Sequence, residues 1–185
     1  MKTLLPLLLV IMLSSCKSHQ KNDNDRSKHI VVKDDIQKTA VWQYADSILS
    51  GKVQASDDER TFALFDSLQS KNKATRQLTF EVYKAISLKA DGALAEGMGN
   101  YIKSYFQYLP GEFLSAYHTL PGNQKQKLLE DFAYEFYASG NSSQQDINGY
   151  FKSIEDACND CSFENKNALK DIRIKVIALA IKYKD

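Results

Sequence analysis

Apolar residues recur at helical spacing along most of the chain from about residue 34 onward. The first stripe follows an i, i+4, i+5, i+8 pattern, which one face of an amphipathic helix produces, and it ends at Gly51. Seven further stripes follow, separated by short polar, glycine-containing or proline-containing turns. No segment alternates apolar and polar residues for long enough to predict a strand. The pattern therefore predicts a single all-α domain over residues 34–185, built from about eight short-to-medium helices.

Three local patterns sharpen this prediction. Ser56 followed by Glu59 has the spacing of a capping box, with Ser56 at the N-cap. Gly97 and Gly99 fall inside a helical stripe, which indicates either a late helix start near Asn100 or a close crossing of another backbone. The last helix, from about Asn165 to Lys182, is apolar nearly all round in its second half, so we expect it to be central and buried. Such helices can form an irregular bundle or a short HEAT-like solenoid of helical hairpins.

The first sixteen residues have the layout of an export signal. Lys2 precedes an apolar run over residues 4–13, and the small residues Ser14 and Ser15 lead into Cys16. A helix of ten residues spans about 15 Å, half of the roughly 30 Å of hydrocarbon in a bilayer, so a transmembrane helix is disfavoured. Leu13-Ser14-Ser15-Cys16 resembles the lipobox of bacterial lipoproteins.

This resemblance implies that residues 1–15 are cleaved and that Cys16 carries a diacylglycerol and usually a further acyl chain, which together would hold the protein on a membrane. Lys17 follows the cysteine where inner-membrane retention would call for aspartate, so outer-membrane attachment facing the periplasm is favoured, with the cell surface as the alternative. Residues 16–33 are almost entirely polar up to Ile30, as expected of a flexible tether.

Composition narrows the possible partners. Hydrophobic residues make up 43% and charged residues 25% of the chain, which is ordinary for a globular domain. The formal net charge is +1, and removal of the signal with Lys2 leaves equal numbers of acidic and basic residues. A neutral, exported chain is a poor candidate for nucleic-acid binding.

Cys158 and Cys161 are the two cysteines that remain once Cys16 is lipidated. In an oxidising compartment the favoured interpretation is a local disulfide that closes the last turn. Two reduced core thiols, redox chemistry and metal binding are the alternatives. Redox catalysts place this motif at a helix N-terminus after a strand, and a zinc site needs two more ligands, whereas His118 is the only histidine of the folded region.

Catalytic residues are hard to assemble from this chain. His118 could act as a general base with Glu112 nearby in sequence, but no nucleophile motif accompanies the pair. Adjacent carboxylates such as Asp57 and Asp58 diverge by about 100° on a helix. The sequence therefore predicts no cofactor and no metal site, and it favours a non-enzymatic protein over an enzyme with a site near Glu112 and His118.

Aromatic residues gather in the middle of the chain, and adjacent ones such as Tyr105 with Phe106 or Phe136 with Tyr137 cannot both face the core. We therefore expect some tyrosines to reach the surface or line a groove that binds a protein, because tyrosine is enriched at interfaces. The residues expected in this patch are Tyr101, Tyr105, Tyr108, Phe113 and Tyr117. The expected function is an envelope lipoprotein that binds another envelope or secreted protein as an adaptor, assembly or immunity-type module. A structural or small-ligand-carrier lipoprotein is the further alternative.

Overall fold

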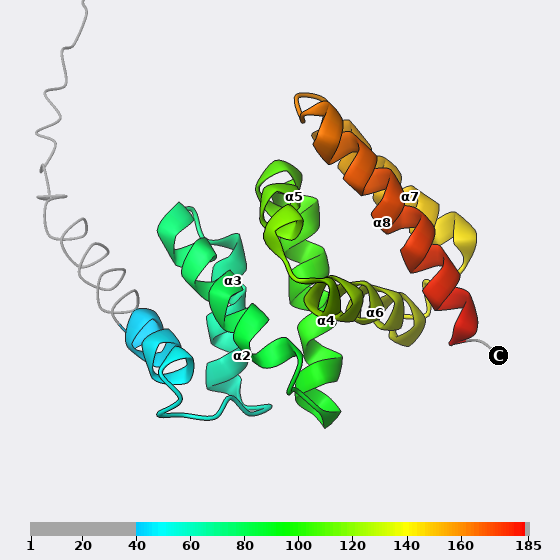
Figure 1. Cartoon of the computed structure of the whole chain (residues 1–185). Coiled ribbons are helices and arrows are strands. Elements are labelled where there is room, and N and C mark those ends of the chain that lie inside the picture. Colours follow the sequence, from blue (N-terminus) through cyan, green and yellow to red (C-terminus); the bar gives the residue numbers. More distant parts are fainter. Residues whose placement is uncertain (1–39, 184–185) are drawn as a thin grey trace, which may run out of the picture. The chain divides into compact units, whose positions relative to one another are not determined.

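A computed structural model describes residues 40–183 of the chain, and within this range every regular element is a helix (Figure 1). Residues 40–49 are helical, and the elements that follow are α2 (Glu59–Asp66), the 3-10 turn η1 (Ser67–Gln69), α3 (Lys73–Ser87), α4 (Gly92–Tyr108), α5 (Pro110–Thr119), α6 (Gly122–Ala138), α7 (Gln144–Ala157) and α8 (Phe163–Lys182). The predicted all-α class is confirmed. The expected signal peptide, the expected lipidation site at Cys16, the expected tether and the expected start of the first helix near Asp34 lie outside the described residues.

Several helices begin at a short polar side chain that caps the first backbone N–H groups. Asn72, Ser143 and Ser162 each accept a hydrogen bond from the backbone N–H three residues later, at the starts of α3, α7 and α8. At α2 the prediction was wrong by two residues, because Asp58, and not Ser56, is the N-cap. The Asp58 carboxylate accepts from the Thr61 N–H at 2.7 Å, while Ser56 only donates to Asp58.

The core is a connected set of aromatic rings contributed by successive helices. Phe113 of α5 is completely buried and stacks on Phe106 of α4, with ring centroids 4.2 Å apart. Phe80 of α3 and Phe132 of α6 also pack against Phe113, and Phe151 of α7 packs edge-on against Phe106. These buried rings connect the helices from α3 through α7 into one core, in which aromatic packing adds to the hydrophobic stabilisation.

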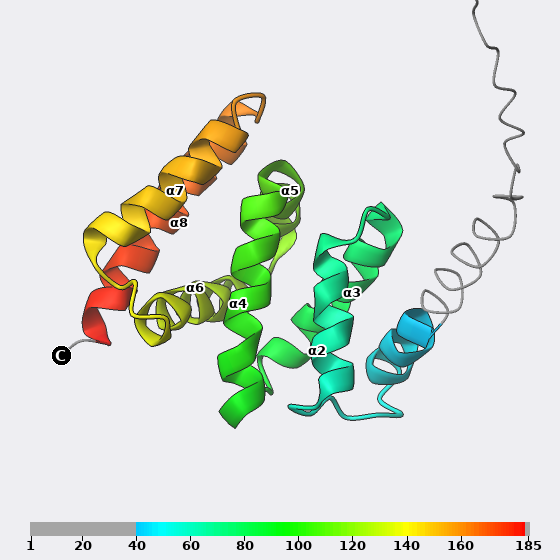
Figure 2. The same ribbon diagram turned by 180° about the vertical axis from the view of Figure 1, so that it is seen from behind.

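The central element of the described bundle is α4. Its main contacts are with α2, η1, α5, α6 and α7, whereas the main contacts of α8 are with α5, α6 and α7 (Figure 2). The expectation of a central, buried last helix was wrong. One face of α8 is buried through Leu169, Ile172, Val176 and Ala180, but Ile174 is 67% exposed.

The described residues, 40–183, belong to one compact unit. Its helices range in length from 8 to 20 residues, which is unlike the uniform repeats of a solenoid. The described residues are therefore best described as an irregular all-α bundle.

Candidate functional site

The tyrosine patch expected from the sequence does not form as an exposed surface. Tyr105, Phe113 and Tyr117 are 1%, 0% and 6% exposed, and they belong to the aromatic core. Burial of a tyrosine requires a partner for its hydroxyl, and Tyr105 donates to Glu112 at 2.8 Å. Tyr101 is half-buried and stacks on Phe62, so Tyr108, which is 53% exposed, is the one residue of the expected patch on the surface.

Glu112 takes part in a structural ion pair. Arg76 of α3 donates to both of its carboxylate oxygens, from Nε at 3.0 Å and from a terminal nitrogen at 2.6 Å. The other terminal nitrogen of Arg76 donates to the Ser70 carbonyl at 2.7 Å. The hydrogen bonds from Arg76, joined by the one from Tyr105, hold the pKa of Glu112 below its usual range. With both oxygens occupied, Glu112 ties α3 and α4 to the start of α5.

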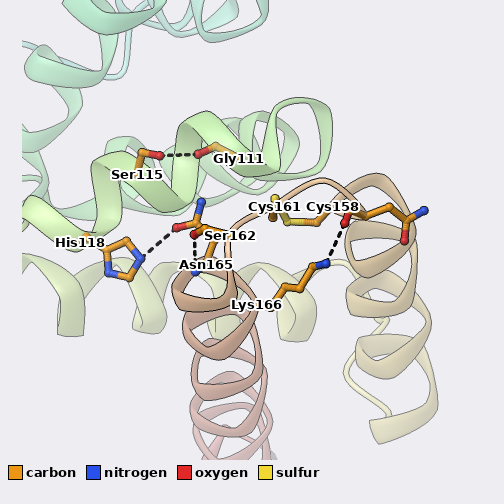
Figure 3. Close-up of a disulfide and its surroundings, with 9 residues drawn as sticks. Gly111, Ser115, His118, Cys158, Cys161, Ser162, Asn165 and Lys166 are labelled. Carbon is orange, nitrogen blue, oxygen red and sulfur yellow. Dashed lines mark hydrogen bonds between the residues drawn. A yellow bond between two sulfur atoms is a disulfide. The ribbon is translucent and has the colours of Figure 1, made fainter.

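His118 lies at the other end of α5 and does not meet Glu112. Its Nε2 is 3.0 Å from the Asn165 side-chain oxygen (Figure 3). Its Nδ1 is 3.7 Å from a carboxylate oxygen of Glu164, and both partners lie at the start of α8. The structure therefore gives the two residues separate partners. The catalytic pair considered from the sequence is not assembled.

Cys158 and Cys161 form a disulfide in the turn between α7 and α8 (Figure 3). Cys158 is buried, and Cys161 lies beside Gly111 at the start of α5, where an added Cβ would be 3.7 Å from its sulfur. The bond therefore closes the α7–α8 turn, and its Cys161 sulfur lies against the start of α5. Among the described residues, no group of histidine, cysteine and acidic side chains is arranged to hold a metal ion.

A surface hollow of about 280 Å³ lies where α4, α6 and the end of α8 meet. Lys127, Glu130, Asp131 and Tyr134 come from α6, and one turn apart they face the same side of that helix. The remaining lining comes from Gly92, Ala95 and Glu96 of α4 and from Tyr183 at the end of α8. Three carboxyl groups thus line the hollow against a single ammonium group.

Three tyrosines in mutual contact form a cluster beside this hollow, which we call the tyrosine rim: Tyr134, Tyr137 and Tyr183. Their ring centroids are 6.3 Å apart for Tyr134 and Tyr137, 5.8 Å for Tyr134 and Tyr183, and 6.0 Å for Tyr137 and Tyr183. Tyr137 and Tyr183 are 46% and 38% exposed. Contacts within the cluster hold its rings in place, so that little freedom is lost when a partner packs on them.

The base of the hollow is the buried carboxylate of Asp131, which is 5% exposed. Tyr83 of α3 donates to one of its oxygens at 2.8 Å, and Lys127 is paired with the other. Burial raises the pKa of Asp131, although the bonds from Lys127 and Tyr83 oppose this shift. Both Asp131 oxygens are thus occupied. Glu96 and Glu130 are the other two carboxylates of the lining, and one Glu130 oxygen accepts a hydrogen bond from Gln126 at 2.9 Å.

The pKa values of the two tyrosine hydroxyls at the hollow are raised, in part by the nearby carboxylates. Loss of hydration, followed by the neighbouring Glu96 carboxylate, raises the pKa of Tyr134. Loss of hydration, with Glu130 and Asp131 nearby, raises the pKa of Tyr183. Aromatic faces and carboxylates both attract cations. The hollow and its rim are thus chemically suited to a lysine or arginine side chain.

Sequence reasoning found part of this surface. The adjacent pairs of aromatic residues predict that some tyrosines leave the core, and Tyr137 beside the buried Phe136 does so. Tyr183 was missed, because it follows the last helix and its proximity to α6 is a tertiary feature. Its spacing could have revealed it, because Tyr183 lies on the same face of α8 as the buried residues Ile172 and Val176.

A second hollow, a cleft of about 490 Å³, lies between residues 48–55, the end of α3 and the start of α4. Most of its lining residues are aliphatic, but polar atoms make up the larger part of its exposed wall, and Lys89 and Asp91 are among the lining residues. Leu49 and Val53 in its lining are 41% and 37% exposed, so the cleft is open to solvent. It therefore differs from the enclosed apolar cavity expected of a small-ligand carrier.

None of the helices within residues 40–183 combines the length and apolar character needed to cross a bilayer. Comparison of the chain with protein-family models, with curated proteins and with solved structures finds no match.

Proposed function

We propose that this chain is a lipid-anchored protein of the bacterial envelope that binds a partner protein through the tyrosine rim and the acidic hollow beside it. The observation that carries the proposal is the contact among Tyr134, Tyr137 and Tyr183 at the edge of a hollow walled by Glu96 and Glu130. Clustered surface tyrosines are typical of contact surfaces, where they supply large apolar area at low conformational cost.

The partner is a protein that presents a basic side chain. A lysine or arginine placed in the hollow would lie against the ring of Tyr134 or Tyr183 and near the two wall carboxylates. The ring and the charges act together, because a cation over an aromatic face gains about 0.5–2 kcal/mol depending on how far it is desolvated. The surrounding tyrosines then exclude water from the contact.

The anchor is Cys16, which by its resemblance to a lipobox cysteine carries the lipid. The protein would stand on the periplasmic face of the outer membrane, with residues 17–33 as the tether. Adaptor, assembly and toxin-neutralising proteins are the classes of binding protein that fit such a position. The proposal includes no catalytic role, because Glu112 and His118 have separate structural partners.

Site-specific photocrosslinking in the producing cell tests the proposal. A benzophenone amino acid placed at Tyr137 should form a covalent adduct with a protein partner, identified by mass spectrometry. Tyr108 is the matched control, since it is also an exposed tyrosine of the bundle but is not part of the hollow.

The double variant Glu96→Gln, Glu130→Gln should reduce the Tyr137 adduct by about 10-fold, because each lost attraction weakens binding and slows association. Raising the ionic strength during crosslinking should also reduce it. The proposal is overturned if the Tyr137 probe forms no adduct, or if the probe at Tyr108 captures the same protein equally well.

A further inference from the structure

The outward face of α8 carries large apolar side chains that no described element covers. Phe163, Ile174 and Ile181 are 81%, 67% and 52% exposed, and Ile177 is half-buried beside them. The other face of the same helix packs on α6 and α7 (Figure 1). Exposed residues of this size are normal when scattered, but these lie in line along one helix.

The positions on this face follow a heptad repeat. Residues 163, 167, 170, 174, 177 and 181 alternate steps of four and three, which is the spacing of the a and d positions that form the contact seam of a coiled coil. In this register the a positions are Asn167, Ile174 and Ile181, and the d positions are Phe163, Lys170 and Ile177. We call these six residues the α8 seam. It runs along about 27 Å of helix.

We infer that the α8 seam pairs with the α8 seam of a second copy of this chain, with the two helices parallel. β-Branched residues are accommodated at the a positions of parallel coils, and a single asparagine at an a position fixes register and oligomeric state. Ile174 and Ile181 are the β-branched a residues, and Asn167 is the single asparagine. This surface is separate from the tyrosine rim and does not depend on its function.

The charges that flank the seam distinguish parallel from antiparallel pairing. Lys166 occupies a g position and Asp171 the e position of the next heptad, so a parallel pair places Lys166 of each copy next to Asp171 of the other. In an antiparallel pair, the Asp171 residues of the two copies would lie next to each other, and so would the two Arg173 residues. Both Lys166 and Asp171 are exposed, and their present local partners, the Asn159 carbonyl and Lys175, can be exchanged at little cost.

Preformed structure lowers the cost of pairing through so short a seam. An isolated peptide of this length would have to fold on binding, whereas α8 is already held by its buried face and by the disulfide turn before it. Lys170 is the seam position that opposes pairing, because two ammonium groups meet there. Its four-carbon stem allows the charge to reach water while the methylenes stay in the contact.

Cysteine crosslinking of the intact lipoprotein in its membrane tests the inference. With copper–phenanthroline as the oxidant, an Ile174→Cys variant should give a covalent dimer on a non-reducing gel, because equivalent a positions are neighbours in a parallel pair. A Lys175→Cys variant is the control, since residue 175 is exposed and adjacent in sequence but lies off the seam. Absence of the Ile174→Cys dimer, equal crosslinking at both positions, or an adduct with a different protein would overturn the inference.

Two substitutions change the pairing in opposite directions, which separates it from general misfolding. Ile174→Glu should raise the dimer dissociation constant by about 100-fold or more in analytical ultracentrifugation of the detergent-solubilised protein, because an apolar contact is lost on both copies. Lys170→Leu should tighten the dimer, whereas Lys175→Leu should not. Circular dichroism spectra should be unchanged in every variant. If Lys170→Leu leaves the dissociation constant unchanged, the seam is not the contact.

Discussion

The backbone of Gly99 in α4 lies directly against the carbonyl oxygen of Asp131 in α6. A Cβ built at Gly99 would be 2.7 Å from this oxygen and 3.2 Å from the Cβ of Glu135. The absence of a side chain at Gly99 thus allows the two helices to cross closely. The same crossing places the first turns of α4 beside Asp131 and Tyr134, so it also shapes the hollow.

Replacement of Gly99 by alanine should destabilise the domain by about 1–3 kcal/mol, even though alanine is the better helix former. The reason is that the added methyl group meets backbone, which cannot move aside without shifting a helix. Urea denaturation followed by circular dichroism measures the change. We also expect the variant to lose Tyr137 photocrosslinking before it loses its helical signal.

Two other glycines provide matched controls for this effect. Gly97→Ala would meet the edge of the Phe62 ring, whose nearest carbon is 2.7 Å from the built Cβ, and a ring can rotate away. Gly149 is exposed within α7 with nothing inside 4 Å, so Gly149→Ala should stabilise by up to about 1 kcal/mol. A Gly99→Ala protein as stable as Gly149→Ala would contradict the crossing argument.

The spacing of apolar residues predicted the helices, because a buried stripe must recur with the helical period whatever covers it. For Gly97 and Gly99 it left open a late helix start or a close crossing of another backbone. The helix starts early, at Gly92, and Gly99 does lie against the backbone of α6, whereas Gly97 faces the Phe62 ring. The periodicity does not say which helix is central. The apolar residues all round α8 suggested full burial, whereas Ile174 and Ile181 remain exposed and α4 takes the central place.

The candidate site was harder to predict for a related reason. The helical spacing of apolar residues identifies which side chains are buried, but it does not identify the side chains that they contact. Tyr105 can lie in the core because Glu112, seven residues away, accepts a hydrogen bond from its hydroxyl group. Tyr183 reaches the surface cluster only because the end of α8 lies against α6. Both are contacts between different elements, which spacing along the chain does not encode.

Glu112 should make the domain sensitive to acid. Its pKa is lowered in the folded protein from the ordinary 4.5 by Arg76 and Tyr105, so the folded state favours the carboxylate. The resulting stabilisation is complete above pH 4.5 and is lost as the pH falls through the folded value. Glu112→Gln should therefore be less stable than the original protein at pH 7, and the difference in unfolding free energy should shrink below pH 4.5. Urea titrations at a series of pH values measure this difference.

Asp131 should show the opposite dependence. Burial raises its pKa in the folded protein above 3.8, so the folded state binds the proton more tightly than the unfolded chain does. The stability contributed by Asp131, relative to an Asp131→Asn variant, should fall as the pH rises through the interval above 3.8. The same titrations provide the test, and a difference that grows with pH would contradict the assignment of burial as the dominant effect.

The disulfide should contribute modestly to stability. Cys158 and Cys161 close a loop with a sequence separation of 3, for which the chain-entropy relation gives about 2 kcal/mol. The double variant Cys158→Ser, Cys161→Ser should therefore unfold at lower urea concentration but keep its helical spectrum. Alkylation followed by mass spectrometry should modify both cysteines only after reduction. A protein whose cysteines are alkylated without reductant would show that the bond is absent under those conditions.

The proposed anchor depends on a single thiol, which gives the sharpest test of localisation. Cys16→Ser should abolish incorporation of an alkyne-labelled fatty acid and move the protein from the membrane fraction to the soluble fraction, because no acyl chain remains to hold it. Cys158→Ser in a second strain controls for any other cysteine and should retain both label and membrane fractionation. In the unaltered protein, neither high salt nor carbonate should release the chain, since acyl chains and not charges hold it. Label that persists in Cys16→Ser, or membrane association that salt removes, would refute the lipid anchor and with it the proposed location of the tyrosine rim.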